Sequence, residues 1–422
     1  MRFKVISLGC PKNLVESEYI TGRLENKGHT LSDKSDTVIV NTCAFVADAA
    51  KESIETIIGE SNANKRVIVT GCLVERYGEK LRELLPEADL FVGRNFYKDI
   101  ETVVKKTGLY QRDGEFSESF PRKVLTGKPT AYLKIQEGCD NRCSYCTVPD
   151  IRGSLRVRNK EEIRKELEWL LENGYREINI IGQDITAYGK RADTSLAGLL
   201  SYLLEVKGDY FLRLLYMHPK GVDKALLNLI AREDRVIKYL DIPIQHTEDR
   251  ILALMGRGYT KADLERLLGD IRRTIPDAVL RTTVIVGFPG ETEEEFSNLC
   301  DFIEKWEFDM LGAFMYSREE GTRAAKLKEQ IKKGIKQQRY NRVMEIQMDI
   351  SKRRLKRLVG KTMKVIVEGK EGGRMVGRLL TQAPDIDGIV LIKGECNIGE
   401  IGEGKVVKTL DYDVIVEVQK TA

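Results

Sequence analysis

The sequence has no long apolar run and very little histidine, and each absence limits what the protein can be. No stretch of 18 apolar residues occurs among its 422 residues, so no transmembrane helix and no membrane partner are expected. Met1 runs almost directly into FKVISLG, without the charged leader and long apolar segment of a secretory signal. With 42% hydrophobic residues, the chain is expected to fold as a soluble cytoplasmic protein.

Eight cysteines in such a chain favour metal or redox chemistry over disulfides, because the cytoplasm keeps thiols reduced. The net charge of +4 neither demands nor excludes a nucleic-acid partner. The length is enough for about three domains at roughly 150 residues each. We expect these at residues 1–107, 131–357 and 358–422, with a Gly- and Pro-containing linker at residues 108–130.

In residues 1–107, three apolar runs alternate with amphipathic helical patterns. The runs are FKVISLGC, DTVIVNTC and KRVIVTGC, and their spacing of about 30 residues is that of a βαβ unit. A parallel sheet is therefore expected, with Cys10, Cys43 and Cys72 just past the carboxyl ends of three strands. Any one of these could be an ordinary buried cysteine. Their repetition at equivalent positions favours a metal or cluster site with one open coordination position.

Residues 131–357 contain six further apolar runs separated by helical patterns, which predicts a partial or full parallel TIM-type (β/α) barrel. A basic helical stretch follows, from Lys326 to Arg357, with 12 Lys or Arg against 3 Asp or Glu. Its exposed face either contacts RNA or is simply solvated. Residues 358–422 alternate short strands with Gly-rich turns and predict a small antiparallel β-barrel. Residues 361–422 hold 9 Lys or Arg and 10 Asp or Glu, a poor balance for phosphate binding.

The segment CDNRCSYC follows the first predicted barrel strand, at the end where barrel enzymes carry their functional loops. It provides three thiols, Cys139, Cys143 and Cys146, and no fourth ligand nearby. A structural zinc site normally has four ligands, commonly as two pairs, and His29, His218 and His246 all lie far away in sequence. Three thiolates instead suit an iron-sulfur cubane with one iron left free for a substrate or cofactor.

This C-x3-C-x2-C spacing, with Tyr145 before the last cysteine, resembles the radical S-adenosylmethionine (SAM) superfamily. The resemblance implies that SAM chelates the open iron of a 4Fe-4S cluster and is cleaved to a 5'-deoxyadenosyl radical. Gly182, Gln183 and Asp184 resemble the superfamily's SAM-binding loop, although GQD departs from the commoner Gly-Gly-Glu form. Gln245 is expected either to face the same cavity or to serve packing.

The whole chain resembles the methylthiotransferases, and SLGCPKN, YLDIPIQH, GFPGETEEEF, YSREEGTRAA and APDIDG favour the branch that modifies an aspartate of ribosomal protein uS12. The resemblance implies a second, auxiliary 4Fe-4S cluster on Cys10, Cys43 and Cys72, and a terminal barrel of the TRAM type. One SAM would supply the methyl group and a second the radical, which would act at the aspartate β-carbon. No catalytic acid or base is expected, since a radical attacks the C–H bond directly.

The expected partner is uS12 or the small ribosomal subunit, with ribosomal RNA as a further contact; the sulfur and electron donors are left unassigned. Three alternatives are a tRNA adenosine methylthiotransferase, another two-cluster radical SAM enzyme and a metal-stabilised RNA-binding protein. The basic helix favours the tRNA substrate, and the near-neutral terminal domain disfavours it. Cys300 is expected in the core and Cys396 at the surface or in a turn. His246 is expected either to touch substrate or, as the favoured alternative, to make a structural hydrogen bond.

Overall fold

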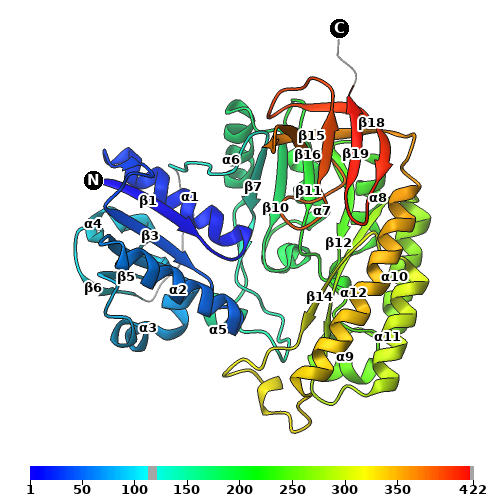
Figure 1. Cartoon of the computed structure of the whole chain (residues 1–422), viewed down its shortest axis with the longest axis horizontal. Helices are drawn as coiled ribbons and strands as arrows, with labels where there is room; N and C mark the ends of the chain where they lie inside the picture. The colour runs from blue at the N-terminus through cyan, green and yellow to red at the C-terminus, as the bar shows by residue number, and fades with distance from the viewer. Residues whose placement is uncertain (113–120, 419–422) are drawn as a thin grey trace.

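The chain folds into three sheet-based parts that follow one another in sequence (Figure 1). The computed structural model describes residues 1–112 and 121–418. Residues 113–120 of the expected linker and residues 419–422 of the expected third domain lie outside the described ranges.

The amino-terminal sheet is parallel, with six strands in the order β2-β1-β3-β4-β5-β6. Its three longest strands are the predicted ones, β1 (Arg2–Ser7), β3 (Thr37–Thr42) and β4 (Arg66–Gly71). Each is followed by a helix, in turn α1 (Pro11–Asn26), α2 (Ala47–Asn62) and α3 (Cys72–Leu84). Strand β3 is buried along its whole length, as expected for a central strand with helices on both faces.

Three short strands were not predicted, because two or three residues are too few to show an apolar period. They are β2 (Thr30–Leu31), β5 (Leu90–Val92) and β6 (Gly108–Tyr110). Strand β6 occupies the first residues of the expected linker and follows the short helices η1 (Arg94–Asp99) and α4 (Ile100–Val103). The amide of Gly93 donates to the Tyr110 carbonyl at 2.8 Å, so this edge belongs to the first sheet.

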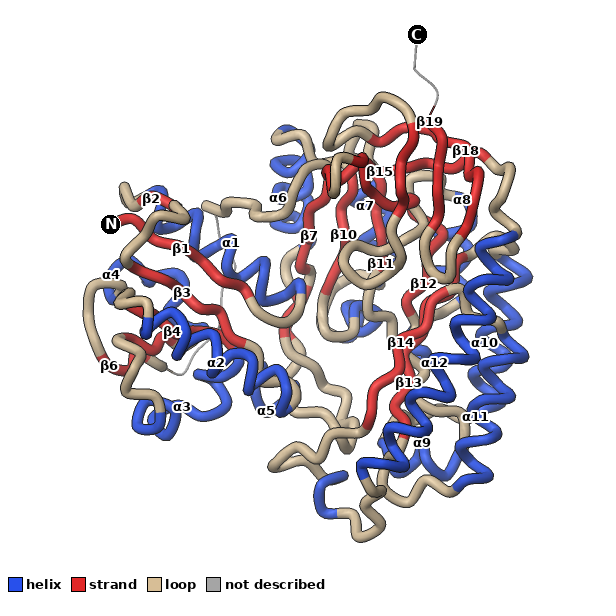
Figure 2. Tube along the Cα trace, viewed as in Figure 1, coloured by secondary structure: helices blue, strands red, loops and turns tan. Residues whose placement is uncertain are grey.

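All six predicted strands of the central part form, and they lie side by side in sequence order as one parallel sheet. The sheet is open, so the partial form of the predicted barrel is the correct one (Figure 2). Its strands are β7 (Thr130–Lys134), β10 (Glu177–Ile181), β11 (Phe211–Leu214), β12 (Val236–Asp241), β13 (Val279–Val286) and β14 (Met310–Met315). The connecting helices are α6 (Lys160–Glu172), α7 (Leu196–Leu204), α8 (Lys224–Arg232), α9 (Asp249–Met255), α10 (Lys261–Thr274) and α11 (Glu293–Trp306).

The predicted basic helix is α12 (Lys333–Lys356), which starts seven residues later than the stretch that suggested it. Val343, Ile346 and Ile350 lie on its buried side and join the core of the central part. Leu327 and Ile331 precede the helix, and Ile335 is exposed, so the apolar stripe is shorter than predicted.

The carboxy-terminal part is a closed five-stranded barrel in the order β15-β16-β17-β19-β18. Four of its strand pairings are antiparallel, as predicted, and the pairing of β17 with β19 is parallel. The strands are β15 (Thr362–Glu371), β16 (Arg374–Leu379), β17 (Val390–Lys393), β18 (Ile401–Thr409) and β19 (Val414–Val418).

The three parts share one apolar cluster. Val15 and Tyr19 of α1 enter it beside Tyr132 and Phe211 of the central strands, and Leu380 joins from the terminal barrel. The APDIDG loop, residues 383–388, docks on the same sheet, where the Tyr239 hydroxyl donates to the Asp387 carboxylate at 2.8 Å. Because each part contributes to this cluster, the parts are held as one body.

A buried ion cluster also joins the central sheet to the terminal barrel. Glu177 of β10 accepts from Arg213 of β11 at 2.7 Å and from Arg378 of β16 at 2.7 Å. All three side chains are at most 2% exposed. Breaking a buried pair leaves an uncompensated charge, which costs about 3–5 kcal/mol.

Across the described ranges, no helix combines the length and apolar composition needed to cross a membrane.

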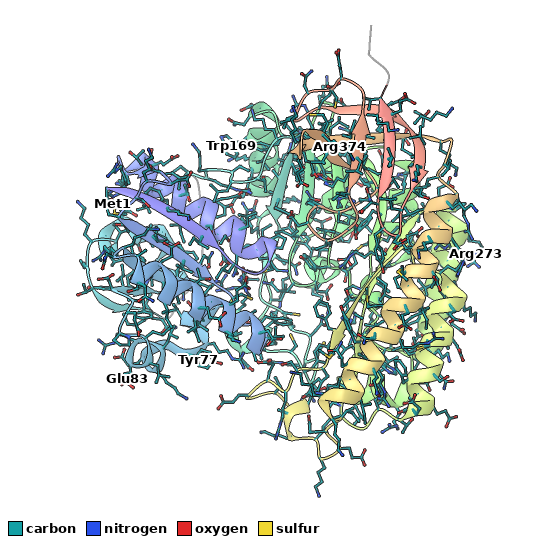
Figure 3. The ribbon with its side chains drawn as sticks, in the orientation of Figure 1. Met1, Tyr77, Glu83, Trp169, Arg273 and Arg374 are labelled. Atoms are coloured by element: carbon teal, nitrogen blue, oxygen red, sulfur yellow. The ribbon has the colours of Figure 1, made fainter. Side chains whose placement is uncertain are left out.

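Replacing Arg378 with Met should lower the melting temperature by several degrees, because Glu177 loses one of its two buried guanidinium partners. Scanning calorimetry would measure the shift. The matched control is Arg374→Met, an exposed arginine on the same strand (Figure 3), for which little change is expected. Equal melting temperatures for the two variants would contradict the role given to Arg378.

Candidate active site

The first thiol triplet lies at one edge of the amino-terminal sheet. Cys10 precedes α1 as its N-cap residue, Cys43 follows β3, and Cys72 is the first residue of α3. Because β1, β3 and β4 are neighbours in the sheet, their carboxyl ends bring the three cysteines together, as predicted. Asn13 connects two of them, since its amide donates to the Cys10 carbonyl at 2.9 Å and its side-chain oxygen accepts from the Sγ of Cys72 at 3.8 Å.

Two glycines make this convergence possible. Gly9 has φ +84°, and a Cβ there would lie 2.8 Å from the Sγ of Cys43. Gly71 has φ +92°, and a Cβ there would overlap the side chain of Asn41. Both positions require a left-handed backbone and close approach, so only glycine suits them.

The Pro-Lys-Asn sequence after Cys10 shapes the rim of the triplet. Asn13 donates to the carbonyls of Leu8 and Thr42, both at 2.9 Å, and so ties the ends of β1 and β3 together. The Lys12 ammonium reaches the Gly182 carbonyl in the central part at 3.4 Å and lies 3.6 Å from the centroid of the Tyr216 ring. Lys12 and Asn13 were recognised from the sequence only as part of a family string.

Arg152 connects the first triplet to the central part. It lies at the end of α5 (Val148–Arg152), six residues after Cys146, yet it donates to the Sγ of Cys72 at 3.3 Å. The same guanidinium contacts the carboxylates of Glu16 at 2.8 Å and Glu137 at 3.0 Å, and it donates to the side chain of Asn13. Arg152 is 5% exposed, so these contacts are made out of solvent.

Arg152 belongs to a buried ion network, defined here as Glu16, Arg94, Lys134, Glu137 and Arg152. Arg94 pairs with Glu16 at 2.7 Å and Glu137 at 2.9 Å, and Lys134 pairs with Glu137 at 2.6 Å. Burial alone would raise the pKa of Glu16, but Arg152, Arg94 and Lys134 lower it to about 2. Burial opposes ionisation of Glu137 too, and Arg94, Lys134 and Arg152 hold its pKa well below the usual range. Both carboxylates are therefore charged at neutral pH.

The three thiols of the first triplet differ in how readily they ionise. Burial would raise the pKa of Cys10, but the charges of Lys12 and Arg152 outweigh it and the pKa is lowered. Burial raises the pKa of Cys43 to about 11 and also raises that of Cys72. Thiolate is the form that binds metals, so the charges of Lys12 and Arg152 favour the ligand form of Cys10.

The second triplet, Cys139, Cys143 and Cys146, occupies the loop between the two-residue strand β8 (Gln136–Glu137) and α5. The guanidinium of Arg257 donates to the Sγ of Cys143 at 3.3 Å, and the amide of Val148 donates to the Sγ of Cys146 at 3.4 Å. Burial raises the pKa of Cys139 to about 11 and that of Cys146 to about 12. Cationic and amide donors aimed at sulfur are the partners that anionic thiolate ligands require.

Within residues 1–112 and 121–418, no three His, Cys, Asp or Glu side chains are arranged to hold a single metal ion. A cubane is much wider than one ion, so thiolates around it do not need to converge on a point.

The predicted SAM loop follows β10 and touches the second triplet's loop. Gln183 donates to Glu137 at 2.8 Å, and Asp184 accepts from Asn141, between Cys139 and Cys143, at 2.7 Å. A Cβ at Gly182 would lie 2.5 Å from the side chain of Gln136, so the loop packs against β8. The carboxylate of Asp184 also caps the short helix η2 (Ile185–Lys190).

The two other predicted cofactor residues, Gln245 and Tyr145, lie outside the loop that follows β10. Gln245 has φ +66° and extends the line of β12 by backbone hydrogen bonds to Thr283 and Ile285, both at 2.8 Å. The Tyr145 ring packs edge-to-face on Phe288, with centroids 6.5 Å apart, and its hydroxyl accepts from Arg257 at 3.4 Å.

Arg152, Arg257 and Glu137 are site residues that sequence reasoning missed. Their partners are distant in sequence, and no spacing rule points to them. The one available signal was proximity, since Glu137 and Arg152 flank CDNRCSYC on either side.

The three other cysteine and histidine residues considered from the sequence take structural positions. His246 is fully buried, accepts from the Glu248 amide at 3.1 Å and faces Glu291 at 3.5 Å, a structural arrangement. Cys300 lies in the core of the central part. Cys396, between β17 and β18, packs partly buried against the terminal barrel.

Three segments of the chain match known protein families. Residues 2–93 match the uncharacterized protein family UPF0004, residues 133–303 the radical SAM superfamily, and residues 359–418 the TRAM domain. Membership of the radical SAM superfamily implies a 4Fe-4S cluster and SAM as cofactors.

Solved structures with a similar fold include two radical SAM enzymes. The methyltransferase TsrM from Kitasatospora setae is 16% identical with a TM-score of 0.55, covering 74% of this chain and 72% of its own. The cobalamin-dependent enzyme OxsB is 13% identical with a TM-score of 0.50, covering 83% of this chain and 56% of its own. These likenesses concern the fold.

Much greater sequence similarity is found to proteins described as ribosomal protein uS12 methylthiotransferase RimO. The protein from Thermotoga maritima is 40% identical over 98% of this chain and 99% of its own length. Those from Geobacter sulfurreducens and Clostridium tetani are 42% and 41% identical, over 99% and 98% of this chain and 98% and 97% of their own lengths. Similarity at this level over whole chains shows that the protein belongs to the RimO family of radical SAM methylthiotransferases.

Proposed function

We propose that this enzyme adds a methylthio group to the β-carbon of an aspartate in ribosomal protein uS12, in the cytoplasm, using SAM and two 4Fe-4S clusters. The observation that carries the proposal is that one buried guanidinium, that of Arg152, connects the segments that hold the two thiol triplets. Arg152 contacts Cys72 of the first triplet and Glu137, two residues before Cys139 of the second. Two sulfur-rich sites joined in this way fit a reaction that needs both at once.

Each triplet suits a cubane with one iron free of protein thiolate. Cys139, Cys143 and Cys146 would hold the cluster that binds SAM, and Cys10, Cys43 and Cys72 would hold the auxiliary one. A cluster ligated by thiolates is anionic, and buried anions need nearby cations. Arg257 provides one beside Cys143, and Arg152 provides one beside Cys72 of the first triplet.

When bound, these groups supply the radical that removes hydrogen from the β-carbon and the sulfur and methyl group that replace it. The chain's own residues bind and orient the reactants. Gly182, Gln183 and Asp184 would line the SAM site, with the last two also holding the cysteine loop through Glu137 and Asn141. Tyr145 and Gln245 would border the same space.

For the domains, we propose the boundaries expected from the sequence with one change. The amino-terminal domain, residues 1–107, is extended by β6, and the linker then runs on to residue 130. The barrel with its basic helix takes residues 131–357, and the TRAM domain residues 358–422.

Contact of α12 with ribosomal RNA is a weaker part of the proposal, because many of its basic side chains already have partners. Arg353 and Arg357 both contact Glu307, Arg354 contacts Asp309, and Lys352 contacts Asp411. Apart from Arg354, the basic partners in these pairs are exposed, and exposed ion pairs contribute little to stability, so a contact of Lys352, Arg353 and Arg357 with RNA is compatible with these pairs.

Two clusters predict a specific iron content. Anaerobically reconstituted protein should hold about eight iron and eight sulfide per chain, as two cubanes do. Replacing Cys139, Cys143 and Cys146 with Ala should leave about half. Replacing Cys300 and Cys396 is the matched control and should leave the content unchanged. Stoichiometric zinc without iron uptake would refute the two-cluster assignment.

The two triplets should be separable in function. With Cys10, Cys43 and Cys72 replaced by Ala, reductive cleavage of SAM to 5'-deoxyadenosine should continue, because the barrel triplet and its loop are intact. Methylthio transfer to uS12 should vanish. Both products can be quantified by mass spectrometry, and normal transfer by this variant would remove the sulfur-carrying role from the first triplet.

The substrate can be tested by assaying uS12 and tRNA with the same reconstituted enzyme, reductant and SAM. An aspartate of uS12 should gain the mass of a methylthio group in place of hydrogen, and tRNA adenosine should stay unmodified. The near-neutral charge of the TRAM segment supports this outcome, because phosphate binding depends on accumulated positive charge. Methylthiolated tRNA beside unmodified uS12 would overturn the substrate and leave the cluster chemistry standing.

A further inference from the structure

Lys12 is unusual among the buried cations of this protein. Within the described residues, nine lysines and arginines are buried, and seven have a carboxylate partner within 4.0 Å. Arg257 lacks one, but its guanidinium faces the sulfur of Cys143. Lys12 is 8% exposed, and its ammonium contacts only the Gly182 carbonyl and the Tyr216 ring. Buried charges are normally paired, so an ammonium without a carboxylate is a site prepared for an anion.

The surroundings hold the Lys12 ammonium in place without neutralising it. The Tyr216 ring attracts the cation by its quadrupole and carries no charge. Tyr216 itself has φ +65°, a conformation uncommon for a residue with a side chain, and its amide donates to Asp241 at 2.8 Å. The carboxylate of Asp241 is occupied by this amide and by Arg281 at 3.0 Å. Helix α1 adds no acidic side chain in its first turn.

The ammonium connects the segment of the first triplet to the predicted SAM loop. It is two residues from Cys10, and its charge acts on that thiol. Its other contact, Gly182, begins the loop that reaches Glu137 through Gln183 and the cysteine loop through Asp184. A group bound to Lys12 would therefore face the first triplet on one side and the SAM loop on the other.

This is where the reacting carbon has to be held. In an aspartate side chain the carboxylate is bonded directly to the β-carbon, so fixing the carboxylate fixes the carbon within one bond length. Resting on the uS12 methylthiotransferase function proposed above, we propose that Lys12 binds the carboxylate of the substrate aspartate and presents its β-carbon to both sites. Adenosine has no carboxylate, so Lys12 would also discriminate against tRNA as a substrate.

The proposal predicts a preference for a charged substrate that depends on Lys12. The probes are uS12 and uS12 with its target aspartate changed to asparagine, binding to reconstituted full-length enzyme without reductant, so that no turnover occurs. Calorimetry should find the aspartate form bound about 30-fold more tightly by the wild type, the effect of one desolvated charge pair. Lys12→Met should lose this preference, and Lys12→Arg should keep most of it.

The matched control is Lys220→Met, which removes an exposed lysine from the loop after β11 at the same end of the sheet. It should keep the preference. Iron content and melting temperature of every variant check that the fold and clusters are intact. The wild-type comparison of the two uS12 forms needs no variant, so equal affinities would refute the proposal even if the Lys12→Met protein misfolded.

Two results would overturn the proposal: equal wild-type affinity for the two uS12 forms, or a preference that survives in Lys12→Met. In the second case, SAM binding that weakens in Lys12→Met would assign the ammonium to the SAM carboxylate. Failure of the underlying function appears differently, as wild-type enzyme that modifies tRNA and leaves uS12 unchanged. Modified uS12 without a Lys12-dependent preference refutes this inference alone.

Discussion

The buried ion network of Glu16, Arg94, Lys134, Glu137 and Arg152 is the constraint on which the site depends. It draws Glu16 and Arg94 from the amino-terminal part and the other three residues from the central part, and the pairs Arg94–Glu137, Lys134–Glu16 and Arg152–Glu16 cross between the two parts. Burying charges is costly, and the cost is recovered only when all partners meet in good geometry. The network therefore fixes how the first sheet sits against the barrel, and with it the relation of the two thiol triplets.

Positive charge is distributed around the site according to what it has to balance. The network contains three cations and two carboxylates, so its positive charge exceeds its negative charge by one. Arg152 pairs with both carboxylates and also donates to the Sγ of Cys72, which places positive charge beside that thiol. Arg257 likewise donates to the Sγ of Cys143, and among the described residues it has no carboxylate partner. Both triplets are thus supplied with positive charge from buried arginines, whose guanidinium groups stay protonated when buried. An anionic cluster could be accommodated at either place without a further counterion.

Much of the fold could be predicted from local pattern. The strands ending before Cys10, Cys43 and Cys72 and the six strands of the barrel all show apolar runs of sufficient length, and a parallel sheet then brings their carboxyl ends to one edge. Strands β2, β5 and β6 were missed because they are too short to have a period. The spacing of Cys139, Cys143 and Cys146 identified the second triplet because all three lie in one loop.

The charged residues of the site escaped prediction for a physical reason. Arg152 and Glu16 are separated by 136 positions, and a lysine or arginine on an unknown surface gives no sign that it will be buried. From the sequence, Lys12 was noted only as part of the string SLGCPKN. That its ammonium lacks a carboxylate partner is a property of the folded chain, so the sequence could not predict it. Sequence patterns locate ligands that share a loop or a strand end, and tertiary packing decides which charges accompany them.

The position of Arg152 in the chain has a consequence for biosynthesis. The ribosome makes the amino-terminal sheet first, and domains generally fold as units while synthesis continues. Cys10, Cys43 and Cys72 are then already assembled when Lys134, Glu137 and Arg152 have still to be made. Until they arrive, Glu16 lacks Lys134 and Arg152, Arg94 lacks Glu137, and Cys72 lacks its cationic neighbour. The first triplet thus receives its cationic neighbour from a segment of the next domain, which is made after the three thiols.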